Sequence, residues 1–336
     1  MVRRSSRLLR LIVALLLFTA GLSLGFLFWV AKDFVSPSRS PIQESRMSWI
    51  ESPEKHGIVT REGRSQAGKT PYLLISPDPL AGVAERGRIL RSELEDREVE
   101  LPLYGTADAL VVLLHGRRGR KESMFPIAER ICAAGFHCLI PDLPASGGSG
   151  HLDQQFATSR HGITLVPDLL QSVAMEHGSV LGAAQDQVFI WGQSLGGCFG
   201  VRAASELGEA CRGLIVVSTF DQLAPLVRDR IGSKAGPLTL PCLLFIRPMV
   251  RALGGPVLTD VRPDLWAKAV GCPVLVVHGD ADRLIAEDRG RALHSAFASA
   301  DKTWLSVSGA GHNNALITDQ PVYATMAKWM RARLLR

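Results

Sequence analysis

Asparagine is scarce in this sequence, and paired cysteine motifs are absent from it. The 336 residues include six cysteines, none of them in a C-x-x-C pair, so the sequence gives no support for a zinc site. Most of these cysteines stand among apolar residues, which is typical of small buried side chains, and their spacing selects no disulfide pairing. The only two asparagines, Asn313 and Asn314, begin no N-x-S/T sequon. No metal ion and no organic cofactor are predicted.

The net positive charge is also small once the N-terminal region is left behind. The net charge is +6 at pH 7, and residues 1–46 hold seven basic and two acidic side chains. The rest of the chain is therefore nearly neutral, with a net charge of +1. A nucleic-acid-binding face needs a basic patch on the folded part of a protein, so no nucleic-acid partner is expected.

The N-terminal basic residues precede a long apolar run. Residues 1–10 form a basic tail, and residues 11–31 hold no charged side chain. A helix rises about 1.5 Å per residue, so this run covers roughly the 30 Å of a bilayer core. It is predicted to be a single transmembrane anchor. Because basic residues stay on the cytoplasmic side, the N-terminus is expected there and the rest of the chain opposite, in the periplasm if the source is bacterial.

Further interpretations concern this apolar segment and the residues that follow it. A cleaved signal peptide is the other interpretation of residues 11–31, with a weak candidate cleavage site at Ser23-Leu24-Gly25. Gly21 and Gly25 form a G-x-x-x-G pair, through which two copies of the helix are able to pair as a homodimer. Residues 32–46 are interpreted as a linker, because they include the stiff polar stretch SPSRSP.

Residues 47–336 are predicted to form one α/β domain. Its first part is hard to interpret, but the apolar runs at 72–75 and 97–104 indicate strands, antiparallel and near a sheet edge. From residue 109 onward, apolar runs alternate with helical stretches, which predicts a mostly parallel sheet covered by helices on both faces. The apolar, proline-containing interval 220–263 interrupts this alternation and is interpreted as a small lid-like insertion of helices.

The residues that follow the apolar runs carry the chemistry, because ligands bind at the carboxyl ends of parallel strands. One run ends in a G-x-S-x-G sequence with Gly192, Ser194 and Gly196. A nucleophile on a sharp strand-to-helix turn requires small residues two positions before and after it. Ser194 is thus a candidate nucleophile, and a structural serine in a tight turn is the alternative.

A serine hydroxyl also needs a base, and the base needs an acid to orient it. Asp282 and His312 follow two later apolar runs, and the interval of 30 residues between them leaves room for one helix and one strand. Asp280 competes for the role of the acid, but the G-x-x-D spacing from Gly279 favours Asp282. The same stretch holds His278, yet alternate residues point to opposite sides at a strand end, so it does not indicate a metal site.

Five stretches in this order resemble the α/β-hydrolase fold superfamily, and within it the serine-aminopeptidase-like and lysophospholipase-like branch. They are VVLLHGRRG, LIPDLPASGGSG, WGQSLGG, CPVLVVHGDADRLI and GAGHNN. The resemblance implies Ser194 as nucleophile, Asp282 as acid and His312 as base, with an oxyanion hole made by the backbone N–H groups of Leu195 and Arg117. The loop PDLPASGGSG departs from the common pattern because its glycines are displaced, so its role is left open.

The expected function is that of a membrane-anchored serine hydrolase that cleaves a carboxylic ester through an acyl-enzyme. The anchor and the apolar insertion favour a lipid-like acyl substrate. Three alternatives stay open: a peptidase or amidase with the same triad, an acyltransferase, and a catalytically silent membrane-tethered scaffold. His115 is expected to shape the oxyanion turn, and Arg117 with Arg118 is a weaker candidate for binding an anionic group. The C-terminal helix is expected to pack on the sheet.

Overall fold

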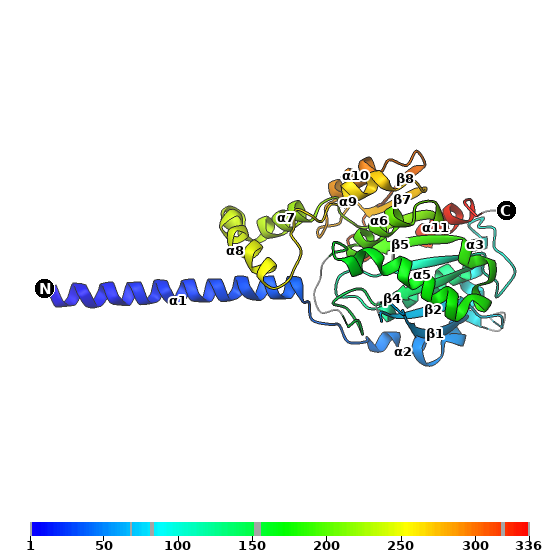
Figure 1. Cartoon of the computed structure of the whole chain (residues 1–336), viewed down its shortest axis with the longest axis horizontal. Coiled ribbons are helices and arrows are strands. Elements are labelled where there is room, and N and C mark those ends of the chain that lie inside the picture. Colours follow the sequence, from blue (N-terminus) through cyan, green and yellow to red (C-terminus); the bar gives the residue numbers. More distant parts are fainter. Residues whose placement is uncertain (1, 68, 81–83, 151–155, 317–319, 335–336) are drawn as a thin grey trace.

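The computed structural model describes residues 2–67, 69–80, 84–150, 156–316 and 320–334, with the side chains of 2–11 and of 320 left out. The basic side chains of the tail therefore lie outside the described part. The first helix, α1 (Val2–Val35), projects from the body of the protein (Figure 1). Its stretch Ile12–Val35 has the length and apolar composition needed to cross a membrane. The helix continues past Lys32 and Asp33, beyond the end of the uncharged run.

The body is built on one eight-stranded sheet of order β1-β2-β4-β3-β5-β6-β7-β8. From β4 to β8 all neighbouring strands are parallel, while β1 pairs antiparallel with β2, and β2 with β4. The mostly parallel sheet expected from the sequence is confirmed. In chain order the strands are β1 (Ile58–Arg64), β2 (Pro71–Pro77), β3 (Ala109–Leu114), β4 (Phe136–Pro141), β5 (Val188–Gln193), β6 (Cys211–Val217), β7 (Val274–Gly279) and β8 (Lys302–Val307).

Helices cover both faces of the sheet, and the strands are apolar on both sides for that reason. In β3, Leu110 and Val112 join the core beneath α5 (Arg160–Leu181) and α6 (Leu195–Leu207). Val111 between them joins the opposite core, beneath α4 (Phe125–Ala133) and α11 (Gln320–Arg331). The C-terminal helix α11 thus packs on the sheet, as expected. Four further helices of the body are α2 (Met47–Glu51), α3 (Glu85–Glu95), α9 (Pro263–Trp266) and α10 (Glu287–Ala296).

The region before residue 109 differs in part from the sequence prediction. The run at 72–75 forms β2, but residues 97–104 form no strand: Pro102 lacks a backbone N–H for a ladder, and Leu103 is 82% exposed. The helix α3 directly before this stretch was not predicted. Neither was β1, because an edge strand carrying Arg61 and Glu62 does not look apolar.

The interval 220–263 holds two helices, α7 (Leu223–Ala235) and α8 (Thr239–Ala252). The helix α8 packs against α1, and Figure 1 shows it beside the part of α1 nearest the body. Val35 of α1 and Val250 of α8 meet at Gly255, where a Cβ would lie 2.5 Å from Val35 Cγ2. Large apolar side chains on the outer side stay exposed, namely Leu238, Leu240, Leu244 and Phe245. The insertion therefore joins the end of α1 to the body.

Candidate active site

Ser194 occupies the sharp turn between β5 and α6. Its backbone has φ 54° and ψ −117°, a region that residues with a Cβ rarely adopt. The Ser194 N–H donates to Val217 O at 2.9 Å, and Thr219 Oγ1 donates to Ser194 O at 2.8 Å. These contacts from the end of the neighbouring strand β6 hold the strained turn in place.

Glycine is required on both sides of this turn. A Cβ at Gly192 would lie 2.3 Å from the carbonyl oxygen of Gly196, and a Cβ at Gly196 would lie 1.9 Å from the carbonyl oxygen of Leu114. Both clashes are with backbone atoms, which cannot move aside without shifting a strand or a helix. The two glycines therefore permit the close approach of β5, α6 and β3 behind Ser194.

Gly196→Ala is expected to lower the free energy of unfolding by about 3 kcal/mol, because the new methyl group would force β3 and α6 apart. Thermal unfolding followed by circular dichroism measures the change. Gly271→Ala is the matched control, since no atom lies within 4 Å of its added Cβ, and its effect is expected to stay within about 0.5 kcal/mol. Equal stability of the two variants would contradict the packing described for the turn.

Asp282 and His312 meet after β7 and β8, at the same edge of the sheet. His312 Nδ1 lies 2.7 Å from Asp282 Oδ2, and the other carboxylate oxygen accepts the N–H groups of Leu284 and Ile285 at 2.8 and 2.9 Å. Asp282 is only 6% exposed. Burial alone would raise the pKa of this carboxyl, but the hydrogen bonds from His278, His312 and Ile285 hold it well below its usual range. Asp282 is therefore ionised at neutral pH beside the imidazole.

The competing acid, Asp280, takes a different place. It is exposed, and its Oδ1 accepts the Gly309 N–H at 2.7 Å. His278 is fully buried and also approaches Asp282, with Nε2 2.9 Å from Ile285 O and 3.5 Å from Asp282 Oδ2. From the sequence, His278 stood out only as a possible metal ligand, and its contact with Asp282 was not expected. In the described part of the chain no group of three or more potential metal ligands is found.

The turn Gly116–Gly119 faces Ser194 from the end of β3. A Cβ at Gly116 would lie 3.5 Å from Ser194 Cβ, and the Gly119 N–H donates to Gly116 O at 3.0 Å. Within the described residues, the backbone N–H groups of Arg117 and Leu195 find no acceptor, which leaves both available to an oxygen of a ligand. Their geometry allows the role that the sequence predicts for them.

Two buried polar residues brace this turn and the loop beside it. His115 Nδ1 lies 2.8 Å from Gly116 O, its Nε2 accepts the Leu143 N–H at 3.1 Å, and burial lowers its pKa. Asp142 accepts the N–H groups of Lys121 and Gly148 at 2.8 and 2.7 Å. The loop with displaced glycines is thus tied to the residues on either side of the turn, to His115 through Leu143 and to Lys121 through Asp142.

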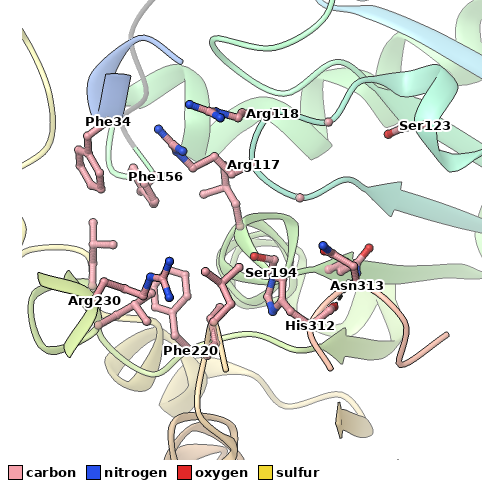
Figure 2. A pocket seen from close by; sticks show the side chains of 18 of the residues that line it. Phe34, Arg117, Arg118, Ser123, Phe156, Ser194, Phe220, Arg230, His312 and Asn313 are labelled. Atoms are coloured by element: carbon pink, nitrogen blue, oxygen red, sulfur yellow. Dashed lines mark hydrogen bonds between the residues drawn. The ribbon is translucent and has the colours of Figure 1, made fainter. Parts of the chain in front are cut away.

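Ser194, His312 and the turn Gly116–Gly119 border one pocket of about 1060 Å³ (Figure 2). Ser194 and His312 lie next to each other on its wall, and the Gln193 side chain donates to the carbonyl oxygen of His312 at 3.4 Å. No hydrogen bond joins Ser194 Oγ to His312 among the described residues, and such contacts often tighten only when substrate binds. The rest of the lining is mainly apolar and includes Phe156, Phe220, Leu226, Ile231, Ile246 and Leu258.

Comparisons with known proteins agree with this architecture. Residues 109–238 match a family model described as the alpha/beta hydrolase fold. The chain is 24% identical over 224 residues to a thermostable monoacylglycerol lipase from Bacillus sp. (strain H-257). The aligned region covers 63% of this chain and 86% of the lipase.

Two solved esterase structures share the fold. An esterase from Pyrococcus furiosus superposes with a TM-score of 0.62 at 13% identity, covering 90% of this chain and 100% of that one. A cold-adapted esterase from an Arctic intertidal metagenomic library gives 0.50 at 16% identity, covering 83% and 94%. Together with the sheet order and the strand-to-helix turn at Ser194, these matches show that the chain has the α/β-hydrolase fold.

Proposed function

We propose that this protein is a membrane-anchored serine hydrolase that cleaves carboxylic esters of acyl chains. The observation that carries the proposal is the 2.7 Å contact between His312 Nδ1 and the buried carboxylate of Asp282, beside the pocket that Ser194 borders. Lipase and esterase relatives support ester hydrolysis over cleavage of a peptide amide. Neither a metal ion nor an organic cofactor is needed for this chemistry.

The reaction proceeds in two halves through an acyl-enzyme. His312 Nε2 takes the proton of Ser194 as its oxygen attacks the ester carbonyl carbon, and ionised Asp282 stabilises the imidazolium that forms. The N–H groups of Leu195 and Arg117 donate to the negative oxygen of the tetrahedral intermediate. When the intermediate collapses, the bond to the alcohol breaks and His312 gives its proton to the leaving oxygen. A water molecule, activated by the same histidine, then releases the carboxylic acid and restores Ser194.

The apolar lining of the pocket supports a substrate with an acyl chain. Each methylene group that leaves water gains about 0.8 kcal/mol, so a pocket bordered by Phe220, Leu226 and Ile231 favours chains long enough to reach them. The proposed anchoring of α1 in a membrane brings the pocket close to lipids. In this topology the body lies on the side opposite to the arginine-rich end of α1. Pairing through Gly21 and Gly25, which have no neighbour within 4 Å of an added Cβ in the single chain, stays a prediction.

A panel of p-nitrophenyl esters tests the substrate class. We expect kcat/KM to rise at least about tenfold from the acetate to the octanoate, because the longer chain buries more apolar surface. Leu226→Trp, which fills part of the pocket, is expected to shift the preference toward shorter chains, whereas Leu240→Trp on the exposed side of α8 is expected to leave it unchanged. Activity confined to the acetate would rule out the acyl-chain substrate.

A further inference from the structure

The last turns of α1 border the active-site pocket. Val30, Asp33 and Phe34 are all part of its lining, and Phe34 stacks on Phe156 with ring centroids 5.3 Å apart and planes 15° from parallel. Figure 2 shows Phe34 and Phe156 together on the side of the pocket where α1 ends. The helix that is proposed to anchor the protein is therefore also one wall of the site.

Asp33 connects this helix to the turn that faces Ser194. Its carboxylate pairs with Arg117 Nη2 at 3.1 Å and, through its other oxygen, with Arg118 Nη2. Arg117 also donates to the backbone carbonyl oxygen of Asp33, so it caps the C-terminal end of α1. The Asp33 side chain is 25% exposed, which gives these ion pairs more weight than pairs that are fully in water. Both arginines are thus engaged with Asp33, and their binding of an anionic substrate group stays a prediction.

The turn that Asp33 holds is strained. Arg118 has φ 61°, a left-handed conformation that side chains with a Cβ adopt only at a cost. Such conformations persist where surrounding contacts fix them. On one side the turn is fixed by its own hydrogen bond and by the packing of Gly116 near Ser194. On the other side the turn is held by the contacts of Asp33 with Arg117 and Arg118. The backbone N–H of Arg117 lies between these two sets of contacts.

We infer that Asp33 is a positioning residue, which sets the oxyanion-binding turn Gly116–Gly119 from the end of the membrane helix. The inference rests on the proposed function, because it assigns Asp33 an effect on the transition state of ester hydrolysis. Asp33 does not touch the reacting atoms. It acts through Arg117 and Arg118, so it is expected to change kcat with little change in KM.

The test compares kcat and KM of the full-length protein in detergent, with a soluble p-nitrophenyl ester as substrate. We expect Asp33→Ala to lower kcat about tenfold, a fraction of the loss caused by removing an oxyanion donor outright. Asp33→Asn keeps the shape of the side chain and is expected to change kcat in the same direction. Glycine adopts a positive φ freely, so the turn needs less support from Asp33 in an Arg118→Gly variant. In that background Asp33→Ala is expected to lower kcat only about twofold.

Asp301→Ala is the matched control, because Asp301 pairs with Arg333 at 2.7 Å on the surface of the body and is expected to leave kcat unchanged. If the wild type hydrolyses the ester and Asp33→Ala does so with the same kcat, the inference is overturned while the proposed function stands. An equal loss of kcat from Asp33→Ala with and without Arg118→Gly also overturns it, since the two residues would then act independently. A folded wild type without hydrolysis overturns both.

Discussion

Replacing Ser194 with alanine is expected to lower kcat for ester hydrolysis by about 10⁴-fold or more, since the acyl-enzyme can no longer form. The measurement is kcat of the full-length protein in detergent at saturating ester. The fold is expected to persist, because the strained turn is held by backbone contacts to Val217 and by Thr219 rather than by the Ser194 hydroxyl.

Ser218→Ala provides the matched control for this variant. Ser218 directly follows the neighbouring strand β6, is fully buried and also has a positive φ, 47°, and its hydroxyl has no partner among the described residues. It is expected to keep kcat within about threefold of the wild type, as a substitution away from the chemistry should. Comparable activity of Ser194→Ala and Ser218→Ala would exclude Ser194 as the nucleophile.

Asp282→Asn is expected to lower kcat by about 10⁴-fold. The amide keeps the size of the side chain but cannot stabilise the imidazolium, and it disturbs the hydrogen bond that fixes the tautomer of His312. Asp280→Asn, two residues earlier and exposed, is expected to change kcat by less than about threefold. The same kinetic assay serves both variants. A large loss in Asp280→Asn together with an active Asp282→Asn would assign the acid to Asp280 instead.

Features that depend on neighbours in the chain could be predicted from the sequence. The apolar runs from residue 109 onward gave the parallel sheet, because strands covered on both faces need apolar residues throughout. The turn around Ser194 was predictable in the same way, since Gly192 and Gly196 mark a close approach within five residues. Asp282 and His312 could then be assigned to the same site as Ser194, because all three follow strands whose carboxyl ends meet at one edge of the sheet.

Features that depend on distant contacts could not be predicted. Asp33 lies 84 positions before Arg117, and no period or motif connects the two. It looked like the polar end of an apolar segment, yet it lies in the pocket wall because α1 continues past the uncharged run. The edge strand β1 was missed for a related reason, since one side of an edge strand faces water and tolerates charge.

The most direct test of the account is labelling of the full-length protein with a fluorophosphonate probe, followed by mass spectrometry of the labelled peptide. An activated serine displaces fluoride from the probe and keeps the phosphorus group. We predict a single modified peptide with the label on Ser194, and no labelling of His312→Ala, in which the base is missing. A folded wild type that stays unlabelled, or that carries the label on another residue, would contradict it.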